Sequence, residues 1–499
     1  MTDILLGQSY FLRFDPKLYE AMQPYPPLGT LYAASVMRDA GYRVALFDAM
    51  LAEGTQEWDA ALERYQPRFA AIYEDSFNYL SKMSLLRMRD AALAMIASAK
   101  ARGSQVIVCG SDATDHPEVY LNAGARVVII GEGDSALPDV VRALQSGGLE
   151  DVRGIAFRDG AGEIARTQPR PVISDLDSIP FPAWDLVDRQ RYADIWREHH
   201  GYYSMNLVTT RGCPFHCNWC AKPIWGQRYH VRSPENVVAE MQWLKDHFNP
   251  DHIWFMDDIM GIQDTWIERF ADLLDAAGLR IPFKSLNRVD LLLRGRTIPA
   301  LARAGAQIVW VGAESGSQKI LDSMEKGTRV EQIYEATRQL HAHGVKVAFF
   351  LQFGYPGETR EDIERTLRMV RDLMPDDIGI SVSYPLPGTK FYEAVKHELG
   401  ERVNWVDSAD LAMLYQGPFA TAFYRQLHTV VHKEYRARKA ASALRQALRD
   451  PRRLQPALIR QTVSAIYHWL GLPAARAELD RLAALPHEPT RVSNVTLLP

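Results

Sequence analysis

Cysteine is scarce in this chain of 499 residues, which contains only four. Three of the four, Cys213, Cys217 and Cys220, lie within eight residues of one another. This distribution makes a poor disulfide framework, whereas a tight group of thiols is a plausible metal site in a reducing compartment. The cysteine content therefore argues against a secreted, disulfide-stabilised domain.

Long apolar runs are also absent. No stretch approaches the roughly 20 apolar residues that a membrane-spanning helix needs. The start, MTDILLGQSYF, lacks the basic flank and the apolar run of a signal peptide. We therefore expect a cytoplasmic protein without a membrane span. Apolar residues make up 47% and charged residues 24%, which indicates a folded chain, and the length predicts roughly three domains.

No large charge excess exists, but the charge is unevenly distributed. The net charge is −4, yet residues 421–499 hold thirteen Lys and Arg against five Asp and Glu. A nucleic-acid patch is one interpretation of this basic tail. A solvated helix face or a docking surface for an acidic partner is the preferred interpretation, so nucleic acid is not an expected partner.

Residues 1–150 alternate between short β-rich runs and helical patterns. The predicted strands are ILLG, YRVALFDA, FAAIY, QVIVCG and RVVIIGEG, and the predicted helices are LGTLYAASVMRDAG and segments near 55–65 and 82–102. This alternation predicts an open, parallel, doubly wound sheet of the Rossmann-like type. Residues 151–203 follow as a hairpin around Asp159-Gly160 and a Pro-rich linker.

A second strand–helix series occupies residues 204–400. The predicted strands are MNLVTTRG, HIWFMDD, PFKSLNRV, QIVWVGAES, KVAFFLQFG and IGISVSYP, and the predicted helices cover 234–248, 264–277, 297–304, 330–343 and 360–373. Polar and glycine-rich residues gather directly after each strand, which favours a partial (β/α)6 barrel over another open sheet. Residues 401–499 are expected to form a helical, basic C-terminal region.

The cysteine loop follows the first predicted barrel strand as TRGCPFHCNWC, with the spacing C-x3-C-x2-C. Three thiolates on one loop can hold three irons of a [4Fe–4S] cluster, and the fourth iron then stays open to bind a substrate. The alternative is a structural zinc loop, which needs a fourth ligand such as His216. Cys109 falls in an apolar strand of the first domain and is expected to be a small core residue.

The cysteine loop and the motifs after it resemble the radical S-adenosylmethionine (SAM) superfamily over about residues 204–400. This resemblance implies that the cysteines carry the cluster and that the open iron binds SAM. The implied SAM-site residues come from the aromatic before the last cysteine and from F-x-D-D, N-R-x-D, G-x-E-S-G-S and G-x-P-G-E-T segments. They are Trp219, Asp257, Asp258, Arg288, Glu314, Ser315 and Gly354.

The N-terminal segments resemble the cobalamin-binding domain of one branch of that superfamily. The matching segments are Pro26-Pro27-Leu28-Gly29, Gly110-Ser111-Asp112-Ala113 and Gly131-Glu132-Gly133-Asp134, where Asp134 replaces a usual Glu. Gly29, Gly110, Ser111, Gly131, Glu132 and Gly133 are the implied cobalamin contacts. The D-x-H-x-x-G signature that supplies a histidine to cobalt is absent. A domain that keeps the fold without the cofactor is the alternative.

The resemblance implies an enzyme that cleaves SAM reductively and removes hydrogen from an unactivated carbon of a small-molecule substrate, with electrons from a donor such as flavodoxin or ferredoxin. Radical C-methylation with methylcobalamin is the first expectation. A methyl-free oxidative cyclisation or rearrangement is the second, because the layout also resembles the anaerobic Mg-protoporphyrin monomethyl ester cyclase group. An iron–sulfur sensor that binds nucleic acid is the non-enzymatic alternative. Substrate identity and oligomeric state cannot be read from the sequence.

Overall fold

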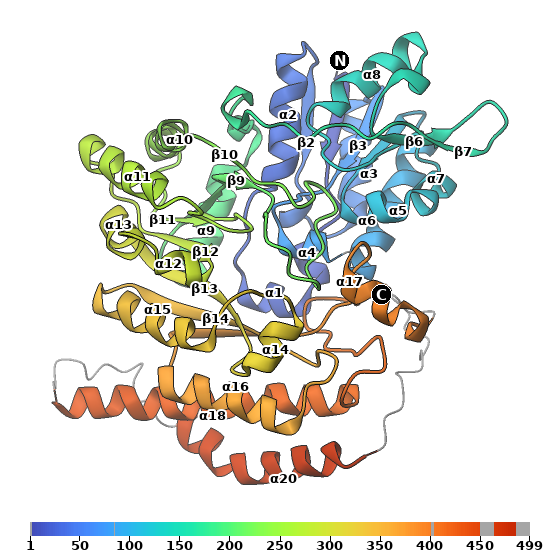
Figure 1. The fold of residues 1–499 in the computed structure, drawn as a ribbon. Helices are drawn as coiled ribbons and strands as arrows, with labels where there is room; N and C mark the ends of the chain where they lie inside the picture. Colours follow the sequence, from blue (N-terminus) through green and yellow to red (C-terminus); the bar gives the residue numbers. More distant parts are fainter. Residues whose placement is uncertain (1, 84, 401–403, 450–463, 486–499) are drawn as a thin grey trace.

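The computed structural model describes residues 2–83, 85–400, 404–449 and 464–485 (Figure 1). Its strands form a seven-stranded sheet in the N-terminal third, a six-stranded sheet in the middle of the chain, and a two-stranded ribbon. Two helices of the C-terminal region lie below the six-stranded sheet in the view of Figure 1. The predicted order of a doubly wound domain, a partial barrel and a helical region is confirmed.

The seven-stranded sheet has the strand order β2-β1-β3-β4-β5-β6-β7. The first five strands are parallel, and β6 and β7 extend the sheet as an antiparallel hairpin. The strands are β1 (Ile4–Gly7), β2 (Val44–Phe47), β3 (Phe69–Tyr73), β4 (Gln105–Cys109), β5 (Val127–Ile129), β6 (Ile155–Arg158) and β7 (Ile164–Arg166). The hairpin lies where the Asp159-Gly160 turn was expected.

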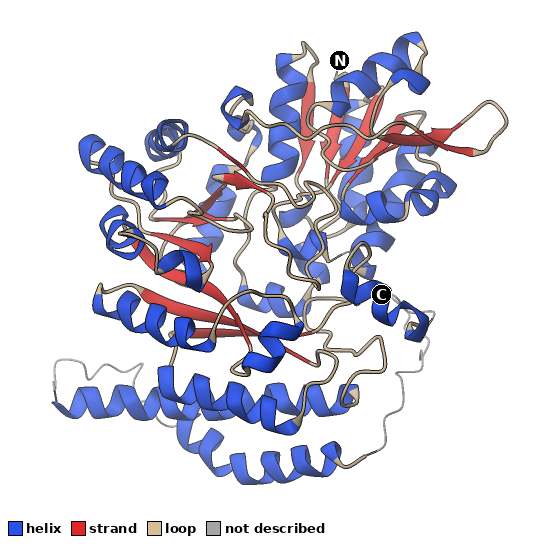
Figure 2. Ribbon diagram, in the orientation of Figure 1, coloured by secondary structure: helices blue, strands red, loops and turns tan. Residues whose placement is uncertain are grey.

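Helices cover both faces of this sheet, as Figure 2 shows. The helices of this part of the chain are α1 (Pro16–Ala21), α2 (Leu28–Asp39), α3 (Thr55–Tyr65), α4 (Tyr79–Lys82), α5 (Leu86–Ala101), α6 (Ser111–Asp115), α7 (Pro117–Ala123) and α8 (Ala136–Ser146), of which α1 lies below the sheet, beside β14, in the view of Figure 1. One apolar core joins the sheet to α3, α5 and α7, and another joins it to α2 and α8. Cys109 is 2% exposed in the second core, as expected for a small core residue.

The six-stranded sheet is entirely parallel, with the order β15-β14-β13-β12-β11-β8. Its strands are β8 (Ser204–Leu207), β11 (His252–Phe255), β12 (Phe283–Asn287), β13 (Ala306–Glu314), β14 (Lys346–Phe353) and β15 (Asp377–Val382). Strand order follows chain order, as in a (β/α) barrel. The sheet curls into an open half-barrel, so the predicted partial (β/α)6 barrel is confirmed.

The half-barrel helices lie on the outer side of the sheet (Figure 2). They are α10 (Pro234–His247), α11 (Asp264–Ala277), α13 (Thr297–Ala304), α15 (Val330–Ala342) and α16 (Arg360–Leu373), whereas the short helices α12 (Val289–Leu292), α14 (Gln318–Ser323) and α17 (Lys390–Val395) follow the carboxyl ends of β12, β13 and β15. The sequence did not predict α9 (Arg189–His200), which forms in the linker because Asp188 caps its start and Tyr192 and Trp196 are fully buried.

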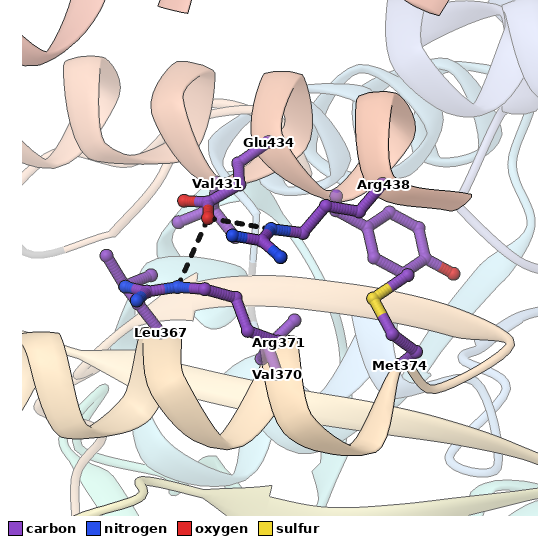
Figure 3. Close-up of a pocket in the computed structure, with 8 residues that line it drawn as sticks. Leu367, Val370, Arg371, Met374, Val431, Glu434 and Arg438 are labelled. Carbon is purple, nitrogen blue, oxygen red and sulfur yellow. Dashed lines mark hydrogen bonds and ion pairs between the residues drawn. The ribbon is translucent and has the colours of Figure 1, made fainter. Parts of the chain in front are cut away.

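The described part of the C-terminal region includes the helices α18 (Thr421–Arg449) and α20 (Leu472–Ala483), and residues 464–470 are helical as well. Glu434 of α18 joins them to the barrel, because it pairs with Arg371 of α16 and with Arg438 and Arg476. A shallow pocket between α16 and α18 surrounds this group (Figure 3). None of the sequence-predicted site residues lines that pocket. None of the described helices is long and apolar enough to span a membrane.

Candidate functional site

The cysteine loop runs from Gly212 to Tyr229, between the two-residue strands β9 (Thr210–Arg211) and β10 (His230–Val231). Gly212 has φ +78°, and a Cβ at this position would collide with the carbonyl oxygen of Arg228. Only glycine fits this turn without strain. The loop therefore leaves the carboxyl end of the first barrel strand through a turn that its own sequence dictates.

Asn218, between the second and third cysteines, anchors the loop to the barrel. Its Nδ2 donates to the carbonyl of Ser323 at 2.8 Å, and its backbone N–H donates to the carbonyl of Met324 at 3.0 Å. The hydroxyl of Tyr355, after β14, donates to Asn218 Oδ1 at 2.8 Å. These bonds tie the middle of the loop to α14 and to the edge of the sheet.

The three thiols remain partly accessible, in contrast to the buried Cys109. Burial raises the pKa of Cys213 and raises the pKa of Cys220 to about 12, and the other thiols of the loop add to both shifts. Among the described residues, no three His, Cys, Asp or Glu side chains lie close enough to hold a single metal ion. The assignment of these cysteines as cluster ligands therefore rests on their spacing and on the position of their loop.

Arg288 lies against the cysteine loop at the end of β12. Its guanidinium centre is 3.7 Å from the centroid of the Phe215 ring, and its Nη1 is 3.8 Å from Cys217 Sγ. Its Nε donates to Asp290 at 3.0 Å and its Nη2 to the carbonyl of Lys326 at 2.8 Å. The carboxylate that pairs with Arg288 is thus its neighbour Asp290, and the arginine braces the loop around Cys217.

The two acids after β11 have different surroundings. Asp257 is 2% exposed and accepts hydrogen bonds from the backbone N–H and hydroxyl of Thr209, both at 2.6 Å, and from the N–H of Thr210 at 2.9 Å. Burial raises its pKa to about 6, against these hydrogen bonds. Asp258 is more exposed and pairs with Lys82 of α4 in the N-terminal domain. Asp257 holds the strand that leads to the cysteines, and Asp258 faces the other domain.

Glu314, at the end of β13, is buried and paired. Its backbone has φ +57°, and its Oε1 accepts a hydrogen bond from Lys326 Nζ at 2.7 Å. Both side chains are less than 10% exposed. A Cβ at Gly312 would lie 2.6 Å from both Glu314 Oε1 and Lys326 Nζ, so this glycine makes room for the pair. Sequence reasoning missed Lys326, which lies twelve residues beyond Glu314 without a motif of its own.

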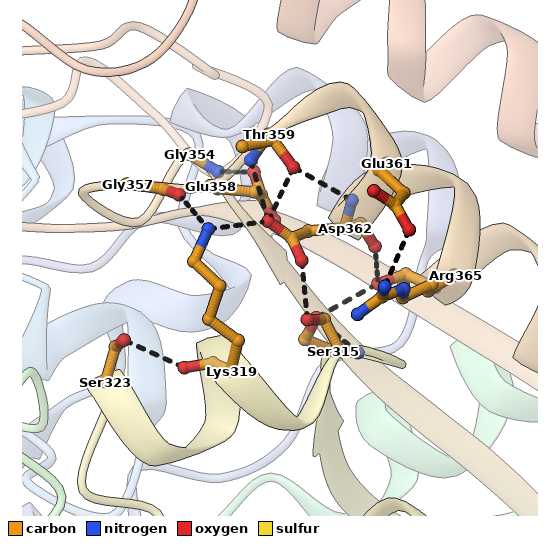
Figure 4. Close-up of polar contacts among 12 residues, drawn as sticks. Ser315, Lys319, Ser323, Gly354, Gly357, Glu358, Thr359, Glu361, Asp362 and Arg365 are labelled. Atoms are coloured by element: carbon orange, nitrogen blue, oxygen red, sulfur yellow. Dashed lines mark hydrogen bonds and ion pairs between the residues drawn. The ribbon is translucent and has the colours of Figure 1, made fainter.

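Ser315 points away from the cysteine loop. It is fully buried, its hydroxyl lies 3.1 Å from Thr366 Oγ1, and it accepts a hydrogen bond from the N–H of Ser317. Figure 4 shows it beside Asp362, whose carboxylate binds Ser317, Thr359 and Lys319. Burial opposes ionisation of Asp362, but these hydrogen bonds hold its pKa below the ordinary value. The hydroxyl of Ser315 therefore contributes to the junction between β13 and α16.

Gly354 forms the turn after β14 with φ +82°. Its N–H donates to Glu358 Oε2 at 2.7 Å, and its carbonyl accepts a hydrogen bond from the Tyr415 hydroxyl. A Cβ would lie 3.0 Å from Met413 Cε and 3.2 Å from Tyr424 Cζ. Segments beyond residue 404 thus pack directly on this turn.

Trp219 packs against the main apolar core, and its indole N–H is buried without a hydrogen-bond partner among the described residues. A buried unpaired donor costs free energy unless another group accepts from it. Trp219 therefore offers a donor beside the cysteine loop.

The glycines of the N-terminal motifs are in close contact with the protein itself. A Cβ at Gly133 would lie 2.5 Å from Cys109 Sγ, and a Cβ at Gly110 would lie 2.7 Å from Glu74 Cγ. At Gly29 it would lie 3.1 Å from Asp75 Oδ1. Asp75 also accepts hydrogen bonds from the N–H groups of Leu28 and Gly29, so it caps α2. Gly131 adopts φ +80°, and its N–H donates to the Thr114 hydroxyl at 3.1 Å.

Glu132 takes part in a buried ion-pair group between the two sheets. Arg211, which directly precedes the cysteine loop, donates from Nη1 to Glu132 Oε1 and to Asp134 Oδ2, both at 2.5 Å. All three side chains are at most 7% exposed. Trp225 Nε1 also donates to Glu132, at 3.2 Å. We name Arg211, Glu132 and Asp134 the interdomain clasp, because it joins the loop after β5 to the cysteine loop.

Polar atoms without partners gather at the carboxyl edge of the seven-stranded sheet. Gln8 follows β1 and is fully buried, and neither atom of its side-chain amide has a partner among the described residues. The hydroxyl of Ser111, after β4, is unpaired in the same sense. Burial raises the pKa of nearby Glu74, after β3, to about 7, although it accepts two hydrogen bonds from Ser9 N–H. Doubly wound sheets bind ligands in this crevice.

Tyr79 and Lys82 of α4 reach the barrel edge, and no sequence motif identified them. Burial raises the pKa of Tyr79, as do its neighbours Tyr384 and Cys220. Nevertheless 52% of Tyr79 is exposed. Tyr79 is therefore an accessible side chain of α4 close to the cysteine loop.

Taken together, a parallel half-barrel carries an accessible cysteine loop at its carboxyl edge, and a doubly wound sheet turns its own carboxyl edge toward the same loop. This combination defines a two-domain α/β protein whose accessible cysteine loop lies between the two sheets. Residues 207–370 match the family model described as the Radical SAM superfamily. The matched residues run from the end of β8 to α16, so the half-barrel of this chain is a radical SAM domain.

Curated relatives align with most of the chain. An uncharacterised methyltransferase of Pyrococcus horikoshii is 28% identical over 388 residues, which are 76% of this chain and 81% of that protein. The anaerobic magnesium-protoporphyrin IX monomethyl ester cyclase of Rubrivivax gelatinosus is 26% identical over 77% of this chain and 68% of the cyclase.

Solved structures share the fold. The cobalamin-dependent SAM radical enzyme OxsB, with aqua-cobalamin bound, superposes with a TM-score of 0.63 at 20% identity over 74% of this chain. The match covers 52% of OxsB, so this chain spans about half of that enzyme. The methyltransferase TsrM of Kitasatospora setae, with cobalamin and a [4Fe–4S] cluster bound, gives a TM-score of 0.61 at 17% identity over 77% of this chain and 72% of TsrM.

Proposed function

We propose that this chain is a cobalamin-dependent radical SAM enzyme that methylates an unactivated carbon of a small-molecule substrate. Cys213, Cys217 and Cys220 ligate a [4Fe–4S] cluster in this proposal. The observation that carries it is the interdomain clasp, which ties the cysteine loop to the carboxyl edge of the doubly wound sheet. A cofactor in the crevice of that sheet would meet the cluster loop beside Tyr79.

The donor groups of the chain fit the implied cofactors. Three accessible thiols on one loop suit a cluster with one open iron. The unpaired amide of Gln8 and the unpaired hydroxyl of Ser111 suit a polar ligand such as cobalamin in the crevice of the N-terminal domain. The other predicted cobalamin residues support the walls of this crevice. The glycines Gly29, Gly110, Gly131 and Gly133 do so by close packing, and Glu132 does so through the interdomain clasp. When bound, the cluster and SAM supply a carbon-centred radical, and methylcobalamin supplies a methyl group.

We assign SAM contacts to the edge of the half-barrel. Trp219 offers its unpaired indole N–H beside the cysteine loop. Arg288 and the Lys326–Glu314 pair supply fixed charges near Cys217. Asp258 supplies an accessible carboxylate for an ammonium, once it exchanges Lys82 for the ligand. The other predicted contacts act on SAM indirectly, because they hold the backbone around its site in place. They are Asp257, Ser315 and Gly354.

The packing of the domains serves the chemistry by excluding water. Residues from 404 onward cover the turn after β14, with Trp405 fully buried against Tyr384 at 4.2 Å between ring centroids. A closed site protects a reactive radical from water and from other hydrogens. The reductant, a protein such as flavodoxin or ferredoxin, would deliver its electron to the cluster, and a cytoplasmic location fits this need.

A methyl-free radical cyclisation is the second candidate, because the Rubrivivax gelatinosus relative is a cyclase. The methyltransferase relative aligns over more of its own length and at higher identity, which favours methylation. A nucleic-acid-binding sensor has less support, since no feature of the SAM-site segments would serve it.

Metal analysis of anaerobically reconstituted protein tests the proposal. With hydroxocobalamin present, about four irons and one cobalt per chain are expected. Incubation with methyl-labelled SAM and a reductant should then produce methylated cobalamin and 5′-deoxyadenosine. Four irons without cobalt would favour the methyl-free reaction, and zinc in place of iron would refute the central assignment.

A further inference from the structure

The inner face of the half-barrel carries a group of side chains that the SAM and cobalamin assignments do not use. Side chains alternate between the two faces of a strand. Phe255 of β11 and Phe283 of β12 pack against Phe270 of α11, with ring centroids 6.0 and 6.2 Å apart, so they face outward. The preceding residue of β11, Trp254, and the following residue of β12, Lys284, therefore face the hollow. They are direct neighbours in the sheet.

This hollow is open within the described part of the chain. Phe350 lies in β14, inside the six-stranded sheet, yet it is 38% exposed. Its ring centroid is 4.6 Å from that of Trp310 on β13. A Cβ at Gly379, the neighbour of Phe350 on β15, would lie 3.3 Å from both rings. Glycine at this position makes room for two large aromatic rings on the inner face of the sheet, of which Phe350 is accessible.

Lys284 faces this hollow, and in the described part of the chain no acid forms an ion pair with it, although Asp377 lies near enough to influence its pKa. Its Nζ is 4.0 Å from the centroid of the Trp254 ring and 5.3 Å from that of Tyr25. No hydrogen bond or ion pair joins it to another described residue. Burial lowers its pKa to about 7, and Asp377 opposes this shift. A buried ammonium is costly unless an anion or several hydrogen bonds compensate it.

The aromatic residues beside Lys284 are held rigidly. The Tyr25 hydroxyl lies 3.0 Å from Ser204 Oγ, and its ring lies 4.9 Å from that of Trp254 and 5.1 Å from that of Trp196. Trp196 Nε1 donates to the carbonyl of Pro24 at 2.7 Å, which fixes the segment that carries Tyr25. Rigid walls lower the entropic cost of binding a ligand.

We propose that Lys284 binds an anionic group of the substrate, a carboxylate or a phosphate, and that Trp254, Tyr25, Trp310 and Phe350 hold the apolar or planar part next to that group. Lys284 lies three residues before Asn287, the last residue of β12, a distance of about 10 Å along the strand. The cysteine loop touches the next residue, Arg288. The anion is thus bound deep in the hollow, and the rest of the substrate extends toward the cysteine loop.

This inference deepens the proposed function and rests on it, because it names the substrate class of the same barrel. Lys346, the first residue of β14, provides an internal comparison. It pairs with Ile308, the neighbour of Lys284 in the sheet, but it is exposed. Lys284 and Lys346 are thus in register on strands of the same sheet, but only Lys284 is shielded from solvent and in contact with aromatic rings.

Competitive acylation of the reconstituted full chain with a trace of labelled acetic anhydride tests the anion site. The label on each lysine is measured by peptide mass spectrometry. Phenylacetate or phenyl phosphate at about ten times its Kd should reduce acylation of Lys284 about tenfold, and acylation of Lys346 should not change. Phenylacetamide, which has the same ring without the charge, should protect weakly. Equal protection by the amide, or no protection by either anion, would overturn the proposal. Protection by only one anion would assign the group as carboxylate or phosphate.

Variants separate this site from the cluster chemistry. In a titration of tryptophan fluorescence with the protecting anion, Lys284→Met should abolish saturable binding, whereas Lys284→Arg and Lys346→Met should retain it. Iron content and SAM cleavage without substrate should be unchanged in Lys284→Met. If wild-type protein fails to bind iron, the proposed function fails, and the anion titration still decides the role of Lys284. Unchanged anion binding in Lys284→Met would refute the site alone.

Discussion

The carboxyl edges of the two sheets face each other, and they use similar residue types in different ways. At the barrel edge, the cysteines stay accessible while Asn218, Asp257 and Arg288 hold their loop in place. At the edge of the doubly wound sheet, the motif residues contact each other and their own core, as Gly133 does with Cys109. Gln8 and Ser111 are residues of that edge whose polar side-chain atoms have no partner among the described residues.

This difference distinguishes residues that hold a site in place from residues whose reactive groups are accessible to a ligand. A glycine motif that already fits tightly against its own protein has a structural explanation without a ligand. A cysteine triplet on an anchored loop has no such explanation, since thiols there contribute little to the core. The barrel edge therefore presents its thiols to a ligand, whereas most motif residues of the doubly wound edge serve the packing of their own domain.

The largest effect is expected at the barrel edge. Cys217→Ala removes one of three thiols, so the iron content of reconstituted protein should fall from about four per chain to well below one. SAM cleavage should disappear with it. Cys109→Ala is the matched control, because Cys109 is buried in β4 and should leave iron content unchanged. Retention of four irons by Cys217→Ala would contradict the assignment of the loop.

The interdomain clasp should give the next largest effect. Arg211→Met leaves Glu132 and Asp134 buried without their cation, which costs about 3–5 kcal/mol of unfolding free energy. Denaturant unfolding of the metal-free chain measures this loss. The control Arg280→Met breaks an exposed pair with Asp275 and should cost less than about 1 kcal/mol. Equal stability of the two variants would mean that the clasp does not join the edges.

Glu358, a buried acid that forms no ion pair with another described residue, provides a contrast to the clasp. Burial raises the pKa of Glu358 to about 8, whereas its unfolded value is 4.5. As pH rises from 5 to 7 the unfolded chain loses this proton and the folded chain keeps it, so stability falls by about 2 kcal/mol over that range. Glu358→Gln keeps an acceptor for Gly354 N–H and should lose this dependence. Denaturant unfolding of both proteins at pH 5 and pH 7 measures this dependence. If Glu358→Gln loses as much stability between these pH values as the wild type, the raised pKa of Glu358 is contradicted.

Much of this architecture could be predicted from the sequence. The bounds of α3, α11, α13 and α16 matched the hydrophobic periodicity, because each has a clear apolar face and a definite end. The half-barrel followed from six repeats with polar residues after each strand. Helix α9 was missed because its composition is polar, and its two buried aromatics, Tyr192 and Trp196, have partners such as Asp48 and Tyr25 in the N-terminal domain, far away in the sequence.

The site was predicted less completely than the fold. Motifs identified residues close to the cysteine loop but not their partners. Lys82, Arg211 and Lys326 reach their acids across long sequence separations, which no local pattern records. Arg211 directly precedes the glycine and cysteine of the loop, so its position was a usable signal. The motifs did identify Ser315 and Gly354. In the structure, however, these two residues hold junctions of the barrel, so their motifs have a structural role there.

The smallest effect is expected from the glycine of the doubly wound edge. Gly133→Ala places a Cβ 2.5 Å from Cys109 Sγ and 2.6 Å from Tyr73 Cε2, and overpacking of this kind costs about 1–2 kcal/mol. The loss should appear in thermal unfolding without cobalamin, because it arises from packing alone. Cys109→Ala should recover part of it in the double variant. Gly160→Ala, at an open hairpin position, should have no such effect. If Gly133→Ala instead keeps full stability and loses only cobalamin binding, then the glycine serves the cofactor, and the two edges are more alike than their packing indicates.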